Sequence, residues 1–394
     1  MTREVVFLGA ARTAIGSFGG ALKDIPPADL GALVIKTALE RAGVAPKDVG
    51  HVVLGHVIPT IPQDAYISRV AALNAGVPQE APAFNVNRLC GSGLQAIVSA
   101  AQSILLGDCE VAVGAGAESM SRGAYLSTSN RWGARMGDVK MLDYMLGALH
   151  DPRLHIHMGI TAENVAARHE ISREQQDAYA TQSQQRAAAA IAAGVFKEQI
   201  VPVELKTRKG VVLFDTDEGV KADTSVEGLA KMKPAFKKED GTVTAGNASS
   251  LNDGAGAVVM ASAEKAKALG LKPLARLVSY AHAGVDPEYM GIGPVPASKL
   301  ALEKAGLKVS DLDLIEANEA FAAQACAVSK EMGFPNDKTN PNGSGISLGH
   351  PVGATGAILV TKAIYELQRT GGRYALITMC IGGGQGIAMI IERV

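Results

Sequence analysis

The sequence predicts an α/β protein in which one structural unit occurs twice, with a more polar segment between the two copies. Short apolar runs of strand length alternate with longer segments of helical periodicity, which is typical of an α/β sheet. The phrase Ala-Leu-Glu-Arg-Ala-Gly-Val at 38–44 returns at 301–307 as Ala-Leu-Glu-Lys-Ala-Gly-Leu, an offset of 263 residues from 38 to 301. Only 4% of the residues are aromatic while 44 are glycine, a composition that suits close helix-to-sheet packing better than a β-sandwich.

The first copy is predicted from four apolar runs and two helical segments. One helix ends at Ala42, because Gly43 stands where left-handed backbone commonly closes a helix. A second helix follows Cys90, because apolar residues recur at helical spacing from Leu94 to Leu105. The expected elements, in chain order, are a strand at 5–9, a glycine-rich turn at 16–20, a helix at 30–42, a buried strand at 52–54, a buried strand at 83–86, the helix after Cys90 and a strand at 110–115.

Cys90 lies in the turn at 87–93, between the strand at 83–86 and the helix that follows. Gly91 and Gly93 let other backbone approach the cysteine closely. Unpaired N–H groups at the start of a helix favour the thiolate form of a cysteine, which is its nucleophilic form. Cys90 is therefore a candidate nucleophile for covalent catalysis; the alternative is a small buried apolar side chain without a chemical role.

The repeat extends beyond a single helix ending. At about the same offset, the turn and helix at Cys90 correspond to the glycine-rich turn around Gly353 and the helix after it, and the strand at 110–115 corresponds to 374–378. A generic helix ending would explain the repeated phrase, but the conserved order of the further elements favours two copies of one α/β unit packed together. We therefore predict an N-terminal half at 1–118, completed by about 247–270, and a C-terminal half at 271–394.

The segment between the halves, 119–246, is predicted to be an inserted loop domain that is more exposed than the halves. It contains the only tryptophan, Trp132, the run at 155–158 and a charged stretch at 206–238. Because binding residues often lie on loops held by a rigid scaffold, this segment is expected to bind a ligand. One amphipathic helix is expected to carry Glu163, Arg168, Glu170 and Arg173.

Two polar residues follow the apolar strand at 312–315. Asn318 and Glu319 lie where this strand ends and a helix begins, the place at which α/β sheets commonly bind ligands. Alternatively, Asn318 caps the helix and Glu319 lies in its first turn, which would stabilise the helix by about 1 kcal/mol without any chemical role. From these residues alone, capping is the better supported interpretation.

Two glycine-rich segments complete the set of candidate residues. His350 lies within 345–356, where imidazole suits proton transfer near neutral pH and the glycines indicate closely approaching backbone; a surface-turn histidine is the alternative. Cys380 follows the strand at 374–378 and precedes four glycines within 382–386. Backbone N–H groups in such a loop are able to stabilise a developing oxyanion.

Composition and motif spacing exclude several classes of function. A formal net charge of -1 gives no general electrostatic reason to bind nucleic acid or an anionic membrane, and the longest run of small apolar residues, 187–196, is too short to span a bilayer. The four cysteines lack close pairing, so reduced thiols in a cytoplasmic protein are expected. His155 and His157 have no third ligand nearby, so no metal site is predicted. Neither a dinucleotide fingerprint nor a P-loop occurs.

Four segments in this order resemble the thiolase family. They are Asn-Arg-Leu-Cys-Gly-Ser-Gly at 87–93, Asn-Glu-Ala-Phe at 318–321, Gly-His-Pro-Val-Gly-Ala-Thr-Gly at 349–356 and Cys-Ile-Gly-Gly-Gly at 380–384. The resemblance covers essentially the whole chain, including 157–159 and 244–249 of the inserted segment. Within the family, the sequence is most similar to bacterial broad-specificity β-ketothiolases that supply precursors for polyhydroxyalkanoate synthesis.

The resemblance implies a two-step acyl transfer between coenzyme A (CoA) thioesters. Cys90 would attack a thioester or 3-ketoacyl-CoA, His350 would take its proton, and Cys380 would exchange the α-proton of acetyl-CoA. In the family, the counterpart of His350 and a water held by the counterpart of Asn318 bind the enolate oxygen. Backbone N–H groups of Cys90 and Gly382 would stabilise the tetrahedral intermediate. The expected partners are acetyl-CoA, acyl-CoA and free CoA, with no separate cofactor and no metal.

The resemblance also implies that CoA lies across the inserted segment. Lys221 stands where family members often carry an arginine, and supplies charge without a planar stacking surface. Ser250 replaces a glycine that is common at its position. The lysines between 231 and 238 either meet CoA phosphates or form a solvated face with Glu239 and Asp240. The residues expected to contact CoA or its thioester are His157, Met158, Lys221, Phe236, Ala245, Ser249, Met290, Ala320 and Phe321.

By the same resemblance, the duplicated halves should form a five-layered α-β-α-β-α arrangement. The chain should assemble as a homotetramer, a dimer of dimers joined through the loop at 121–142. Two other families fit these residues less well than the thiolase family does. A β-ketoacyl synthase would need a second histidine where Asn318 stands and has no use for Cys380. A sterol-carrier-type acyl-CoA-binding protein is expected to have lost Cys90, His350 or Cys380, and all three are present.

Overall fold

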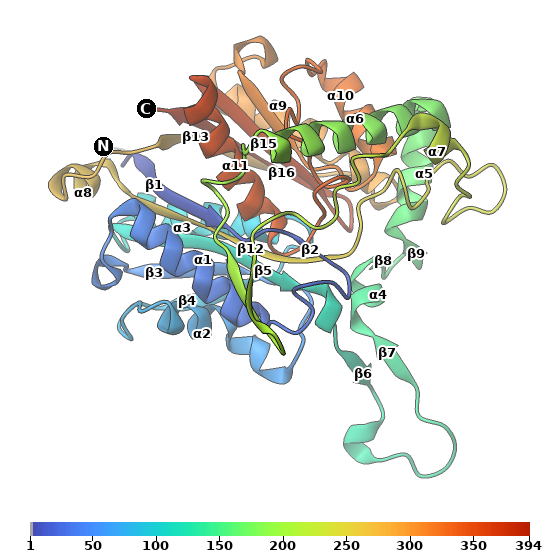
Figure 1. Ribbon diagram of the computed structural model, residues 1–394, viewed down its shortest axis with the longest axis horizontal. Helices are drawn as coiled ribbons and strands as arrows, with labels where there is room; N and C mark the ends of the chain where they lie inside the picture. Colours follow the sequence, from blue (N-terminus) through green and yellow to red (C-terminus); the bar gives the residue numbers. More distant parts are fainter. Residues whose placement is uncertain (1–2) are drawn as a thin grey trace.

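The structure, a computed structural model, describes residues 3–394. Its main sheet has ten strands in the order β14-β15-β16-β13-β1-β12-β5-β3-β4, with β2 paired to β12. β1 and β13 join the two halves of this sheet through only two residue pairs, Val6–Arg276 and Phe7–Ala275. The sheet is therefore two smaller sheets that meet along a short seam (Figure 1).

The N-terminal half is a mixed sheet with helices on both faces. β3 runs parallel to β4 and β5, whereas β12 runs antiparallel to β5 and β1. Gly43 takes a left-handed backbone conformation and ends α1, as the sequence predicts. The elements are β1 (Val5–Arg12), β2 (Gly16–Ser17), α1 (Pro27–Ala42), β3 (His51–Gly55), α2 (Ile67–Asn74), β4 (Ala83–Val86), α3 (Ser92–Leu106), β5 (Val111–Ser119), β12 (Asn252–Ser262) and α8 (Ala263–Ala268).

The C-terminal half repeats this plan. β14 runs parallel to β15, and β16 runs antiparallel to β15 and β13. A single bridge between Ile315 and Thr339 stands where β4 lies in the first half. The elements are β13 (Ala275–Gly284), α9 (Pro294–Ala305), β14 (Leu314–Ala317), α10 (Ala322–Met332), α11 (Thr355–Thr370), β15 (Tyr374–Ile381) and β16 (Gln385–Arg393).

The helices and sheets form the predicted five layers. Apolar residues of α1 and α2 pack on the outer face of the first sheet, and those of α9 and α10 pack on the outer face of the second. α3 and α11 lie between the two sheets and share one core with strands of both halves (Figure 1). The segment Leu89–Leu106 has the length and apolar composition of a membrane span, but it is the core helix of this middle layer.

The 263-residue repeat is confirmed element by element. α3 begins at Ser92 and α11 at Thr355, while β5 begins at Val111 and β15 at Tyr374. The two middle helices also contact each other reciprocally. A Cβ on Gly93 would lie 2.8 Å from the backbone nitrogen of Ala357, and a Cβ on Gly356 would lie 2.1 Å from that of Leu94. These pairs are exchanged by the repeat offset, so an approximate two-fold axis runs between the helices.

The inserted segment connects β5 to β12, which are neighbouring strands. Its hairpin of β6 and β7 projects away from the body of the molecule (Figure 1), and its long helix α6 crosses over the C-terminal half. The domain boundaries given above stay a prediction. The elements are β6 (Tyr125–Ser127), β7 (Met141–Asp143), α4 (Tyr144–Ala148), β8 (His150–Asp151), β9 (Ile156–His157), α5 (Met158–His169), α6 (Arg173–Ala192), β10 (Val203–Thr207), β11 (Gly210–Phe214) and α7 (Val226–Ala230).

Two local predictions are wrong. The strand at 83–86 is β4, which is a sheet edge rather than a buried strand, and Phe84 on it is 42% exposed. The single amphipathic helix is two helices, because Glu170 takes a left-handed conformation and ends α5. Ser172 then caps α6 together with Gln175, a pairing that a reader of the sequence would recognise as a helix start.

Candidate active site

The turn that carries Cys90 is held tightly against the C-terminal half. Leu89 adopts a left-handed conformation, and Gly91 lies so close to Ile381 that a Cβ there would be 2.5 Å from the Ile381 side chain. The sulfur of Cys90 accepts hydrogen bonds from the backbone N–H groups of Cys90 itself and of Gly382. The two halves thus meet at this sulfur.

Burial dominates the electrostatics of Cys90. Burial, together with a smaller contribution from the nearby carboxylate of Glu118, raises the pKa of this partly exposed thiol to about 11, against the lowering effect of the two N–H groups. The prediction that the helix start favours the thiolate is therefore wrong for the free protein. Cys90 is a neutral thiol near pH 7 and needs a base to become a nucleophile.

His350 is positioned with one ring nitrogen free to act as that base. Its Nδ1 is 2.6 Å from the hydroxyl of Thr355, whose own hydrogen is donated to the carbonyl oxygen of Pro351 at 2.9 Å. Thr355 must therefore accept a hydrogen bond from Nδ1–H, which leaves Nε2 unprotonated. Burial lowers the pKa of His350 to about 4, so the ring is neutral and able to take a proton.

Asn318 is placed directly beside this base. Its side-chain nitrogen lies 3.4 Å from Nε2 of His350, and its backbone N–H donates to the carbonyl oxygen of Thr378, which extends the pairing of β14 with β15. The capping interpretation is wrong, because α10 begins at Ala322 and Phe321 occupies the N-cap position. A buried Asn318 (1% exposed) outside the helix is free for a chemical role.

Glu319 holds the segment that leads to His350 rather than a helix end. Its carboxylate accepts hydrogen bonds from Ser183, Asn340 and the backbone N–H of Ile346. The inserted helix α6, which carries Ser183, is thereby tied to the C-terminal half. Burial raises the pKa of this carboxyl, and these donors lower it.

Cys380 lies at the end of β15 and is fully buried. Its pKa is raised far above the ordinary cysteine value, first by burial and then by the neighbouring sulfur of Cys90. The residues that follow the two cysteines are in contact, because a Cβ on Gly91 would lie 2.5 Å from the Ile381 side chain, so the two sulfurs lie close together although they are far apart in the sequence. A thiol with such a high pKa gives a strongly basic thiolate when it loses its proton.

An apolar cluster of side chains surrounds Cys380 on the side of the inserted segment. Met158 and Met290 pack in one cluster with Cys380, Ala320 and Phe321. His157 stacks on Phe236 with ring centroids 4.7 Å apart, and Phe236 meets Phe321 edge-on at 6.1 Å. Burial lowers the pKa of His157 to about 4, so this stack is uncharged at neutral pH.

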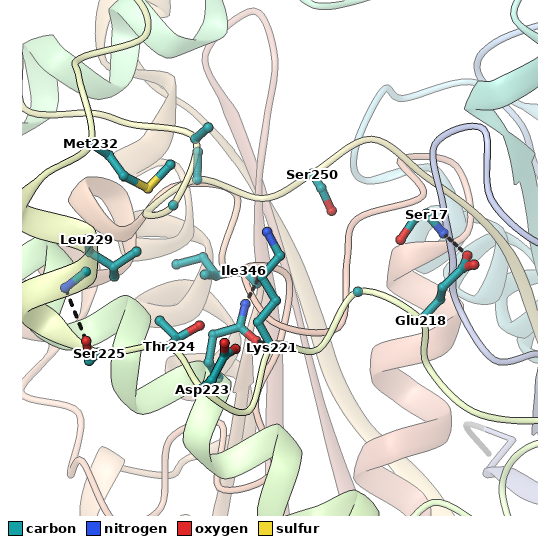
Figure 2. Close-up of a pocket in the computed structure, with 16 residues that line it drawn as sticks. Ser17, Glu218, Lys221, Asp223, Thr224, Ser225, Leu229, Met232, Ser250 and Ile346 are labelled. Atoms are coloured by element: carbon teal, nitrogen blue, oxygen red, sulfur yellow. Dashed lines mark hydrogen bonds between the residues drawn. The ribbon is translucent and has the colours of Figure 1, made fainter.

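A larger cavity of about 470 Å³ lies between the inserted segment and the body. Figure 2 shows Met232 and Leu229 at one end, Ser17 and Glu218 at the other, and Lys221 between them. Ala245 and Ser250 line it, and Ser249, the residue before Ser250, donates its backbone N–H to the carbonyl oxygen of Ala320 at 2.9 Å. The segment 245–250 therefore runs from the cavity to the apolar cluster around Cys380.

Sequence reasoning missed three residues that hold the site together. Glu118 accepts backbone hydrogen bonds from Val57, Ile58 and Gly353, which pins the segment after His350 to the N-terminal half. The side-chain oxygen of Asn252 accepts a hydrogen bond from the backbone N–H of His350, and the hydroxyl of Thr355 fixes the orientation of the His350 ring. A carboxylate near the end of the otherwise apolar strand β5 was the available signal for Glu118, and Thr355 stood within the motif at 349–356.

Comparisons with known proteins agree with this arrangement over the full chain. The family models for the N-terminal and C-terminal domains of thiolase match residues 5–264 and 271–393. A Cupriavidus necator protein named beta-ketothiolase BktB is 67% identical over 394 residues and covers 100% of both chains. An acetyl-CoA acetyltransferase of Chromobacterium violaceum is 54% identical over 392 residues, 99% of this chain and 100% of the relative.

Solved structures match equally well. A crystal structure of human mitochondrial 3-ketoacyl-CoA thiolase superposes with a TM-score of 0.97 at 46% identity and covers 100% of this chain and 99% of that one. A structure of the same human enzyme in complex with CoA gives a TM-score of 0.96 at 45% identity and covers 100% of this chain and 98% of that one. The chain that brings Cys90, Asn318, His350 and Cys380 together belongs to the thiolase family.

Proposed function

We propose that this protein is a β-ketothiolase, an acyltransferase that condenses acetyl-CoA with an acyl-CoA and, in reverse, cleaves 3-ketoacyl-CoA with CoA. The observation that carries the proposal is the meeting of two cysteine sulfurs with a neutral imidazole and an amide in one site, in which Cys380, His350 and Asn318 are buried and Cys90 is partly exposed. A nucleophile and a separate carbon base are both needed for this chemistry. The relatives named beta-ketothiolase and acetyl-CoA acetyltransferase support the same activity.

In the first step, the sulfur of Cys90 attacks the thioester carbonyl carbon while its proton passes to Nε2 of His350. The oxyanion forms where the N–H groups of Cys90 and Gly382 already converge on the sulfur, so they need no reorganisation to stabilise it. The intermediate collapses to acyl-Cys90, and the departing CoA sulfur takes the proton back from His350. The high pKa of Cys90 makes this proton transfer the condition for nucleophilic attack.

In the second step, Cys380 passes its proton to Nε2 of His350, and the resulting thiolate removes an α-proton from acetyl-CoA. The resulting enolate oxygen lies against His350 and Asn318, and the α-carbon attacks the acyl carbon on Cys90. The bond to Cys90 breaks, the sulfur takes the proton from Nε2 of His350, and 3-ketoacyl-CoA leaves. In the reverse direction, the neutral Cys380 thiol protonates the departing acetyl-CoA enolate. The raised pKa suits this role, because a strong base is required for a weakly acidic carbon.

CoA itself is proposed to occupy the cavity of Figure 2, with Lys221 near its charged end and the segment 245–250 along its pantetheine arm. The thioester then enters between His157, Met158, Phe236, Met290, Ala320 and Phe321. We further propose that no separate cofactor or metal takes part, and that the protein works in the cytoplasm as a tetramer. A role in supplying polyhydroxyalkanoate precursors would follow from the same activity.

The proposal is tested by mixing purified protein with acetoacetyl-CoA and CoA. Loss of acetoacetyl-CoA, together with a mass increase of one acetyl group on the peptide that contains Cys90, is the expected result. Cys109→Ser should behave as the starting protein, because Cys109 lies outside the site, whereas Cys90→Ser should form no adduct. No cleavage and no adduct on the unaltered protein would refute the proposal.

A further inference from the structure

A buried ion pair between Lys362 and Glu316 lies close to Asn318. Glu316 lies on β14 and Asn318 follows the last residue of that strand, and Thr355 and Lys362 lie two turns apart on one face of α11. The ammonium of Lys362 donates to the carboxylate of Glu316 at 2.7 Å and to the carbonyl oxygen of Gly343 at 2.7 Å. Glu316 is 0% exposed and Lys362 is 2% exposed, so water does not screen the pair.

A cavity of about 10 Å³, which has room for about one water, lies between Lys362 and Asn318. Four polar residues belong to its wall, namely Asn318, Ser344, Thr355 and Lys362. Two of their oxygens, Asn318 Oδ1 and Ser344 Oγ, are buried and have no hydrogen-bond partner among residues 3–394. The Asn318 oxygen lies against Gly345, another wall residue, where a Cβ would be only 2.9 Å away.

We propose that this cavity holds a water that bonds Asn318 Oδ1, Ser344 Oγ and the ammonium of Lys362, and that Lys362 and Glu316 are positioning residues for Asn318. An ammonium has three N–H donors, and two of those on Lys362 are already used. The third donates to the water, and the water donates to Asn318 Oδ1. Three polar partners in a cavity of this size are what a buried water requires.

The water fixes which way the Asn318 amide faces. Nε2 of His350 carries a lone pair, because Thr355 accepts the ring proton at Nδ1, so an N–H of Asn318 must face it. Holding Oδ1 on the opposite side prevents the amide from turning over. A turned amide would aim an oxygen at the lone pair of Nε2 and withdraw the donor from the enolate. This inference rests on the proposed function, in which Asn318 acts on the enolate.

A crystal structure of the unaltered protein at a resolution that shows ordered water tests the site directly. The expected result is one water within hydrogen-bond distance of Asn318 Oδ1 and the Lys362 ammonium. An empty cavity, or an Asn318 amide whose oxygen faces His350, would overturn the inference without any variant being made.

A double-mutant cycle tests the positioning role. Lys362→Met should lower kcat of thiolysis about tenfold or more, because small displacements of a reacting group have large effects on rate, while KM for CoA and acetylation of Cys90 by acetyl-CoA stay nearly unchanged. Lys362→Met added to Asn318→Ala should reduce kcat no further than Asn318→Ala alone. Independent losses that multiply in the double variant contradict the inference. Lys299→Met, an exposed lysine on α9, is the matched control and should be fully active.

Ser344→Ala provides a milder variant if Lys362→Met does not fold. It removes one partner of the water, so a smaller loss of kcat is expected, again with no further loss on top of Asn318→Ala. Failure of the two proposals is distinguishable. A starting protein without thiolysis refutes the proposed function, whereas an active starting protein with independent losses refutes only the role of Lys362.

Discussion

At the scale of single residues, burial sets the chemistry of this site more strongly than helix ends or hydrogen bonds do. It raises the pKa of both cysteines and lowers that of His350, so all three side chains rest in their neutral forms. These directions favour a neutral thiol and a neutral imidazole over a preformed thiolate–imidazolium pair. The charges of the reaction arise only when a substrate is present, which protects the sulfurs from adventitious modification.

The raised pKa of Cys90 predicts a distinctive pH dependence of alkylation. Only the thiolate reacts, so the rate of Cys90 modification by iodoacetamide should rise about tenfold for each pH unit between pH 6 and 9 without levelling off. Glutathione in the same solution is the control and should begin to level off near pH 9. Mass spectrometry of the Cys90 peptide measures the rate. A constant rate below pH 8 would indicate an ion pair with His350 and contradict the burial argument.

The two sulfurs should separate into two kinetic roles. Cys380→Ser is expected to form acetyl-Cys90 normally, because attack and oxyanion binding use Cys90, Gly382 and His350. Formation of acetoacetyl-CoA should fall by about two orders of magnitude or more, because general acid–base catalysis commonly contributes that much. Quenched-flow acetylation and a condensation assay measure the two steps. Normal condensation by this variant removes Cys380 from the mechanism.

At the scale of elements, the middle layer positions the catalytic residues. α3 follows the turn of Cys90 and α11 follows the segment of His350, and the two helices touch where each carries a glycine. Gly93 and Gly356 are repeat counterparts, so duplication of one unit produced a reciprocal contact. Any side chain at this contact pushes the two catalytic segments apart.

Gly356→Ala therefore tests the helix contact. Its Cβ would lie 2.1 Å from the backbone nitrogen of Leu94, so we expect a loss of about 3 kcal/mol in the free energy of unfolding and a marked loss of kcat. Gly147→Ala in α4 is the matched control, since nothing lies within 4 Å of its Cβ. Urea denaturation should show its stability unchanged or raised by up to about 1 kcal/mol. Equal stability of the two variants would contradict the close contact.

At the scale of the whole molecule, the sequence predicted what depends on periodicity and repetition. The alternation of elements, the duplicated halves and Gly43 as the end of α1 all follow from local patterns, and the four motifs led to the residues of the site. Burial of β4 was wrong, because an apolar run does not show whether a strand has one neighbour or two. The predicted thiolate form of Cys90 was wrong because the desolvation of a thiol depends on which distant segments cover it. Glu118 was missed because its role depends on contacts that only folding creates.

The hairpin of β6 and β7 is the feature of the single chain that most plainly lacks a partner. Trp132 is 90% exposed and Met136 is 94% exposed at its tip, and large apolar side chains at such exposure commonly mark an interface. In the proposed tetramer, the loop at 121–142 joins two dimers. The exposed tip is then covered by its counterparts, and its removal should leave dimers.

Replacing residues 128–139 by a short Gly-Ser turn should therefore halve the molar mass in solution. Four chains of 40.7 kDa amount to about 160 kDa, and light scattering after gel filtration should find about 80 kDa for the variant. Trp132→Ser with Met136→Ser is a milder version that keeps the hairpin and should weaken the tetramer in a concentration-dependent way. Acetylation of Cys90 should persist in the dimer, because the residues that carry it belong to one chain. A shortened variant that still elutes as a tetramer would move the interface elsewhere.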